Sequence, residues 1–126
     1  MIAALSAWHE QHAVAARALN GVRSLPAHVV IEAYSVLTRL PSGLAVPAAA
    51  AARVLGERFD EPPLYLDDAV RGRVVQRLAG SGVLGGASYD GLVALEAAGH
   101  GRTLLTLDQR AQSTYQRLGV AFSVIG

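Results

Sequence analysis

The chain contains no cysteine, no lysine and no long hydrophobic segment. The lack of cysteine excludes disulfide bonds, thiolate catalysis and cysteine-ligated zinc sites. No apolar run approaches the ~20 residues that a membrane-spanning helix requires, so we expect no membrane association. The N-terminal segment has no basic region, and its apolar part is too short for a signal peptide. These absences together favour a cytoplasmic protein.

The charges that are present nearly cancel. The chain has 11 basic residues, all of them arginine, against 10 acidic residues, for a net charge of +1. A chain with so little net charge exerts no global attraction on nucleic acid. Arginine can bind phosphate through two hydrogen bonds, but we attribute the arginine content mainly to the compositional bias of a GC-rich genome. The length of 126 residues and the hydrophobic content of 52% fit one compact domain, residues 1–126.

Helical and extended patterns alternate along the sequence. The spacing of apolar residues, with prolines at helix starts and glycines after helix ends, predicts a series of helices. Short apolar and β-branched runs between them predict strands. Strands alternating with helices imply an α/β fold with a parallel sheet. The helices are expected at 9–19, 26–40, 47–59, 67–80, 88–99 and 108–118, and the strands at 22–25, 64–66, 103–107 and 120–124.

Asp108 directly follows the strand expected at 103–107. Open parallel sheets place their active sites beyond the carboxyl ends of the strands, which makes this aspartate a candidate functional residue. The alternative is that Asp108 only caps the next helix. Asp67 has the same setting, after a Leu-Tyr-Leu strand, without any other indication of function. Alone, Asp108 supports either interpretation.

Glu32 lies in the segment VVIEAYSVL, where apolar residues flank it along most of a helix. Such a carboxylate either emerges on a narrow polar stripe or is partly buried with a cationic or hydrogen-bonding partner. Ser35 and Arg39 fall on the same helix face, so a surface arrangement of Glu32 with Arg39, or a similar surface arrangement, is the structural alternative. We favour a functional role for Glu32.

Asp90 follows a glycine-rich loop and lies in the first turn of its helix. Complementing the helix dipole is a sufficient structural reason for it, although the glycines would also let a substrate approach closely. If Glu32, Asp90 and Asp108 converge, their mutual repulsion implies a bound cation. Carboxylate oxygens suit Mg²⁺ or Mn²⁺, which would activate water and stabilise charge on a phosphoryl oxygen.

Three segments carry a resemblance to a known family. An acid inside an apolar helix that ends in LTRLP, then GGASYDGLVALEAA, then LLTLDQRA, resembles the PIN domain family, and more narrowly its VapC-type toxin ribonucleases. The resemblance covers essentially the whole chain. It implies an α/β/α sandwich around a central parallel sheet, cleavage of RNA that depends on Mg²⁺ or Mn²⁺, a homodimer, and inhibition by a small antitoxin.

The resemblance also implies roles for single residues. Glu32 is similar to the family's helix acid, Asp90 to the acid after the loop, and Asp108 to the acid after the fourth strand. Thr106 is similar to the hydroxyl residue that supports this last acid. The resemblance further suggests Arg39 and Arg110 as RNA contacts.

The sequence departs from the family pattern at its start. The family begins with a strand that ends in a metal-binding Asp-x-Ser, and Met1–Leu5 matches only the apolar stretch that follows it. That strand lies in the middle of the family's sheet, so its loss would expose unpaired backbone groups. We therefore expect the natural protein to begin upstream of Met1.

Two hypotheses of different class follow. The first is a metal-dependent endoribonuclease, the toxin of a type II toxin–antitoxin pair. The second is a catalytically inactive PIN-like module that binds an antitoxin or RNA without cleavage. A receiver-like signalling domain with an acidic Mg²⁺ pocket fits poorly, because such a pocket needs a nearby lysine and the chain has none.

Overall fold

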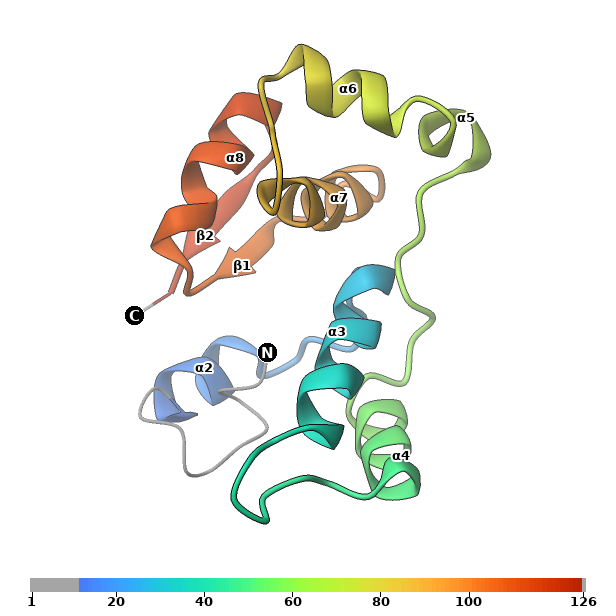
Figure 1. The fold of residues 1–126 in the computed structure, drawn as a ribbon, viewed down its shortest axis with the longest axis vertical. Helices are drawn as coiled ribbons and strands as arrows, with labels where there is room; N and C mark the ends of the chain where they lie inside the picture. The colour runs from blue at the N-terminus through green and yellow to red at the C-terminus, as the bar shows by residue number, and fades with distance from the viewer. Residues whose placement is uncertain (1–11, 126) are drawn as a thin grey trace. The chain divides into compact units, whose positions relative to one another are not determined.

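The structure, a computed structural model, describes residues 12–125, and its internal contacts divide the chain into two compact units. The first unit ends at Pro63 and the second comprises Leu64–Ile125 (Figure 1). Each is described separately below. The expected start of the first helix at His9 and the family-like stretch Met1–Leu5 lie outside the described residues.

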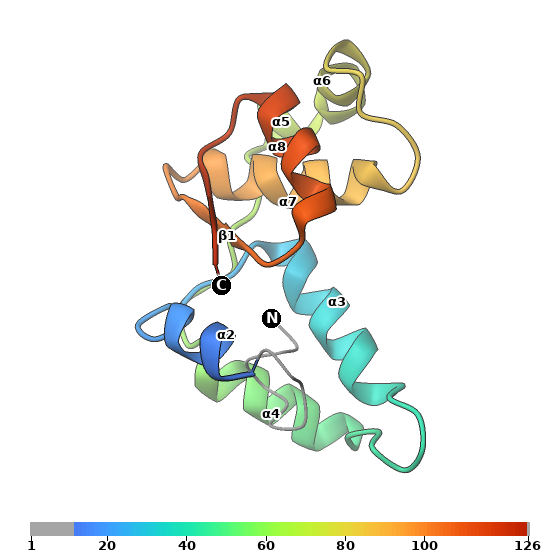
Figure 2. The ribbon, with the colours of Figure 1, turned by 90° about the vertical axis from the view of Figure 1, so that its left-hand side faces the viewer.

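The first unit is helical (Figures 1 and 2). Pro26 and Pro47 occupy the N-cap positions of two of its helices, each with an extended backbone, as expected from prolines at helix starts. Ser42 and Gly43 form the predicted turn between these helices, and both have positive φ, of 58° and 76°. The helices are α2 (His12–Ala18), α3 (Ala27–Thr38) and α4 (Ala48–Arg58).

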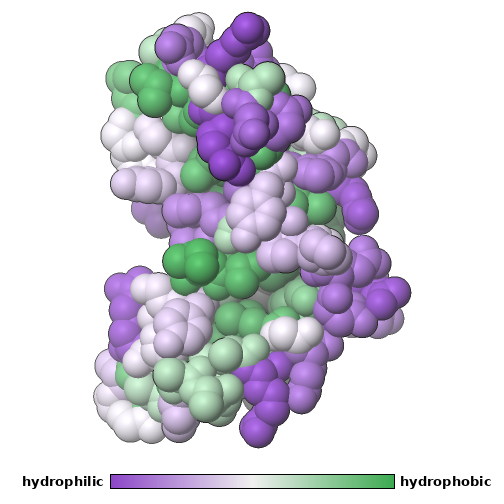
Figure 3. Space-filling model, turned by 90° about the vertical axis from the view of Figure 1, so that its right-hand side faces the viewer, coloured by the Kyte–Doolittle hydropathy of each residue, from purple (hydrophilic) through white to green (hydrophobic). Residues whose placement is uncertain are grey.

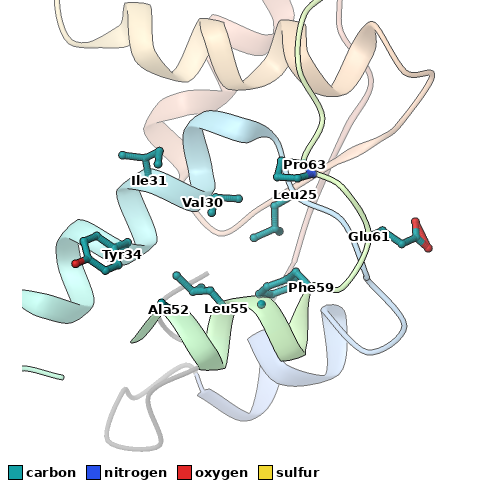
Figure 4. Close-up of a pocket in the computed structure, with 10 residues that line it drawn as sticks. Leu25, Val30, Ile31, Tyr34, Ala52, Leu55, Phe59, Glu61 and Pro63 are labelled. Carbon is teal, nitrogen blue, oxygen red and sulfur yellow. The ribbon is translucent and has the colours of Figure 1, made fainter. Parts of the chain in front are cut away.

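The core of the first unit lies where α3 packs against α4. Beside this core, α3 and α4 border an apolar pocket of about 390 Å³, which Figure 4 shows with Ile31 and Tyr34 on α3 and Leu55 on α4. Hydrophobic side chains gather on this part of the surface in Figure 3. The buried residues of the core are Leu19, Leu25, Ala33, Leu37, Ala51, Leu55 and Phe59.

The strand predicted at 22–25 is wrong, since this segment belongs to no strand or helix. Its polar groups are satisfied in other ways. The carbonyl of Val22 accepts from the Arg58 guanidinium at 3.0 Å, and the carbonyl of Arg23 accepts from the backbone N–H of Glu61. The Ser24 hydroxyl donates to the carbonyl of Pro62 at 2.6 Å. Because side chains and loop backbone pair with these groups, the segment needs no neighbouring strand.

The second unit contains the parallel sheet that the sequence predicts. Its two strands pair in the register Leu104 with Phe122 and Thr106 with Val124. Gly119, with φ of 68°, ends the helix Gln112–Leu118 in the left-handed conformation that glycine adopts most easily. The elements are α5 (Asp68–Arg71), α6 (Val74–Gly80), α7 (Ala87–Ala98), β1 (Leu104–Thr106), η1 (Gln109–Ala111), α8 (Gln112–Leu118) and β2 (Phe122–Val124).

The core of the second unit surrounds α7. Gly91 lies on the face of α7 toward α6, and a Cβ atom there would lie 2.5 Å from Cδ2 of Leu78. The close packing of these two helices therefore depends on a glycine at this position. The buried residues of this core are Leu66, Leu78, Val83, Ala94, Leu95, Ala111, Tyr115 and Leu118.

Two further expectations about this unit are wrong. Residues 64–66 contain only a one-residue bridge at Leu64, because the carbonyls of Tyr65 and Leu66 accept from the side chains of His100 and Arg71 instead of from a strand. The single helix expected at 67–80 is interrupted between α5 and α6 at Gly72, a residue that weakens a helix interior. The predicted α/β class with a parallel sheet is confirmed.

No helix within residues 12–125 is long and apolar enough to cross a membrane.

Candidate metal and nucleic-acid site

Asp108 lies directly beyond the carboxyl end of β1, as the sequence predicts. Its backbone N–H donates to the hydroxyl of Thr106 at 3.0 Å, and Thr106 is itself buried. Its carboxylate oxygen Oδ1 accepts from the backbone N–H of Arg110 at 2.9 Å, which caps η1. The Asp108 side chain nevertheless remains 54% exposed. Asp108 is therefore both a helix cap and an accessible acid, and the two interpretations are compatible.

Asp90 lies in the first turn of α7 and is half-buried. The loop before it contains Gly82 and Gly85, both with positive φ. A helix that leads into a strand through a short loop runs back along that strand, so the start of α7 and the end of β1 lie at one edge of the unit. The topology thus brings Asp90 and Asp108 to the same edge of the second unit.

Glu32 belongs to the first unit, on the exposed face of α3. Its carboxylate oxygen Oε1 lies 2.8 Å from Nε2 of His28, one helical turn earlier. Of the two environments considered for this acid, the polar stripe is correct: His28, Glu32, Ser35 and Arg39 follow one another at helical spacing. Among the described residues, the hydrogen-bonding partner of Glu32 is His28 and not Arg39, so the structural alternative holds in its general form, as a surface pair, with another partner.

His28 is a partner of Glu32 that the sequence pattern alone does not single out. Its spacing of four residues from Glu32 was a usable indication, because side chains at i and i+4 lie next to each other on a helix. Apolar neighbours on both sides obscured this spacing. A second overlooked residue is Glu96, a buried acid on α7 that has an interaction partner of its own.

The two arginines suggested as RNA contacts are both exposed. Arg39 is exposed and follows the last residue of α3. Arg110 lies in η1 beside Asp108, and its side chain is 96% exposed. By contrast, Arg77 and Arg117 bind the backbone carbonyls of Leu118 and Gly82. Arg39 and Arg110 are thus among the arginines whose side chains are open to solvent.

Comparison with known proteins places these residues in a family. The sequence matches the PIN domain over residues 1–117. The chain belongs to the PIN domain family. The match includes Glu32, Asp90 and Asp108, together with Thr106.

The curated relatives narrow the family to its VapC type. The chain is 40% identical to Ribonuclease VapC40 of Mycobacterium tuberculosis, strain CDC 1551 / Oshkosh, over 125 residues, which is 99% of this chain and 93% of the relative. The same figures hold for Ribonuclease VapC40 of strain H37Rv. Ribonuclease VapC27 of that strain is 46% identical over 97 residues, covering 77% of this chain and 70% of the relative. No solved structure matches the chain significantly.

The acids of this PIN domain suit a hard divalent cation in their chemistry. Glu32 and Asp108 both expose about half of their side chains. Glu32 uses Oε1 for its contact with His28, and Asp108 uses Oδ1 for its hydrogen bond with Arg110. Oxygen donors of this kind are what Mg²⁺ and Mn²⁺ take, alongside water. Within residues 12–125, no three His, Asp or Glu side chains gather in one place. The carboxylates therefore match the cation in the chemistry of their oxygen atoms. Asp90 and Asp108 lie at the same edge of the second unit.

Proposed function

We propose that this protein is a metal-dependent endoribonuclease, the toxin of a type II toxin–antitoxin pair, which hydrolyses RNA phosphodiester bonds. The observation that carries the proposal is the 40% identity to a ribonuclease over 99% of the chain. The position of Asp108 beyond the end of β1, with its backbone bound to Thr106, supports it. The proposed partners are a small antitoxin protein and a second copy of the chain, and the proposed location is the cytoplasm.

Glu32, Asp90 and Asp108 would hold the metal ion. When bound, Mg²⁺ or Mn²⁺ supplies an activated water and stabilises negative charge on the phosphoryl oxygen. The protein's own contribution is positional. Thr106 fixes the backbone at Asp108, and the cap to Arg110 fixes the carboxylate, so that this ligand loses little freedom on binding.

The arginines would supply the charge that RNA requires. Three carboxylates repel a phosphate backbone unless cations offset them. Arg110 is adjacent to Asp108 in the fold, and its guanidinium can form two parallel hydrogen bonds to one phosphate. Arg39 would contact the RNA backbone from the first unit. Neither contact reads a base, so these arginines would position RNA without selecting its sequence.

The test is Mn²⁺-dependent cleavage of single-stranded RNA by the purified protein. We expect Asp90→Asn, Asp108→Asn and Glu32→Gln each to reduce cleavage by more than the roughly 10–100-fold loss that outer-shell changes cause. EDTA should abolish cleavage and added Mn²⁺ should restore it. Cleavage that survives EDTA would overturn the metal dependence, and full activity of Asp90→Asn would remove Asp90 from the site.

Asp67→Asn is the matched control for Asp108→Asn. Asp67 caps α5 by accepting from the backbone N–H of Val70 at 2.9 Å, just as Asp108 caps η1. Asparagine preserves both caps, so the two variants should fold equally well. Only Asp108→Asn should lose activity. Binding of RNA or antitoxin by the unmodified protein, without cleavage at any Mn²⁺ concentration, would instead favour the inactive PIN-like module.

A further inference from the structure

His28 and Glu32 form a close side-chain pair on α3. The distance from Nε2 of His28 to Oε1 of Glu32 is 2.8 Å, which is a good hydrogen bond. The two side chains differ in exposure, at 24% for His28 and 54% for Glu32. The imidazole is thus the more buried member of the pair, and the carboxylate is the more accessible one.

Stability does not account for this pair. Pairs of oppositely charged or hydrogen-bonding side chains at i and i+4 on an exposed helix face contribute little to folding. Glu32 is the only acid of α3, and His28 is its only imidazole. Within residues 12–125, Glu32 has no other hydrogen bond or ion pair. His28 is therefore the group that selects one orientation of this carboxylate.

We propose that His28 is a positioning residue of the metal site, acting through Glu32. The imidazole would donate its Nε2–H to Oε1, so that Oε2 would remain available as a metal ligand. A neutral ring with its proton on Nε2 is a sufficient donor. Outer-shell donors of this kind fix the orientation of a ligand and so strengthen metal binding. The inference rests on the proposed role of Glu32 as a metal ligand.

The test measures Mn²⁺ binding to the full chain, from the loss of the electron paramagnetic resonance signal of free Mn²⁺, without RNA. We expect His28→Ala to weaken binding about tenfold, within the range seen for outer-shell changes. His28→Gln should restore most of the affinity, because the glutamine amide can donate to Oε1 from the same position. Circular dichroism should show the same helix content in all variants.

His100→Ala is the matched control. Nε2 of His100 also makes a 2.8 Å contact, but its partner is the backbone carbonyl of Tyr65 and not a carboxylate. Its removal takes one imidazole from the protein without touching Glu32. Mn²⁺ affinity should therefore be unchanged, and an equal loss in His100→Ala and His28→Ala would overturn the inference.

Glu32→Gln separates the inference from the proposed function. If Glu32→Gln weakens Mn²⁺ binding and His28→Ala does not, only the role of His28 is overturned. If Glu32→Gln leaves Mn²⁺ binding unchanged, Glu32 is not a ligand, and both the proposed metal assignment and the inference fall. In the Glu32→Gln background, His28→Ala should have no further effect, because the two side chains act as one unit. A further loss there would show that His28 acts by another route, and would also overturn the inference.

Discussion

The backbone N–H of Asp108 donates to the buried hydroxyl of Thr106 at a distance of 3.0 Å. This bond joins the last residue of β1 to the acid that follows it. It ties the accessible carboxylate to the hydrogen-bonded parallel pair β1 and β2.

Thr106→Val should therefore reduce both stability and cleavage. Valine keeps the volume of threonine but removes the acceptor of the Asp108 N–H, so we expect the free energy of unfolding to fall by about 1–2 kcal/mol. Urea denaturation measures this change. Thr106→Ser retains the oxygen and should keep most of the RNA cleavage. Equal cleavage by the valine and serine variants would show that the hydroxyl does not position Asp108.

Gly91→Ala should destabilise the protein. The new Cβ would lie 2.5 Å from Cδ2 of the buried Leu78, so the core must shift at a cost of about 1–3 kcal/mol. Gly56→Ala is the control, because nothing lies within 4 Å of a Cβ at that position of α4. There alanine should stabilise the helix by about 0.5–1 kcal/mol. Thermal melts that shift in the same direction for both variants would contradict this packing.

The Arg23–Asp60 pair should make the free energy of unfolding depend on pH in the acidic range. The Arg23 guanidinium binds both Asp60 oxygens, at 2.9 and 2.8 Å, and this hydrogen bonding holds the pKa of the Asp60 carboxyl below its usual 3.8. An acid whose pKa is lowered on folding stabilises the protein above its unfolded pKa, and this stability is lost as pH falls through the folded pKa.

Asp60→Asn should therefore have a lower urea midpoint than the unmodified protein at pH 7. The difference should shrink as pH falls from about 4 through the folded pKa, where the unmodified carboxyl becomes protonated too. In a double-mutant cycle with Arg23→Ala, the coupling between the two side chains should disappear over the same range. A midpoint difference that persists undiminished at pH 2 would show that the lowered pKa is not its origin.

Alanine variants of Arg77 and Arg110 should distinguish an effect on stability from an effect on RNA binding. Arg77 donates to the carbonyl of Leu118 at 2.7 Å in a half-buried hydrogen bond, so Arg77→Ala should cost about 1–2 kcal/mol of stability. Arg110 is almost fully exposed, and its replacement by alanine should change stability by less than about 0.5 kcal/mol.

Fluorescence anisotropy with single-stranded RNA completes this comparison. Loss of one phosphate contact in Arg110→Ala should weaken binding and lower the slope of log affinity against log salt by about 0.7. An unchanged slope would remove Arg110 from the RNA interface. Arg77→Ala should leave the slope as it is at temperatures where the variant is folded.

Most helices of both units could be predicted because their boundaries are local, although the single helix expected at 67–80 is interrupted at Gly72. Pro26 and Pro47 fix the starts of α3 and α4, and Gly119 fixes the end of α8. These residues act through their own backbone conformational preferences, which do not depend on the residues packed around them. The strand ending at Thr106 was also predictable, since β-branched and apolar residues gather there.

The strands expected at 22–25 and 64–66 could not be judged from sequence. A short extended segment becomes a strand only if another strand pairs with it. Here Arg58 and His100, distant in sequence, bind the carbonyls of Val22 and Tyr65. The partner of Glu32 was hidden for a related reason: two residues on the same stripe were available to it, and the side-chain conformations of α3 select His28.

The sequence by itself determined the family, the helices and the identity of the candidate acids, because these depend on residue type and on spacing along the chain. Tertiary structure decided which extended segments pair with a strand and which distant side chains bind the carbonyls of the others. It brought Arg58 and His100 to the carbonyls of Val22 and Tyr65, and the start of α7 to the end of β1. The physical reason is that hydrogen bonds are short and directional, so a partner is chosen by position in space and not by distance along the sequence.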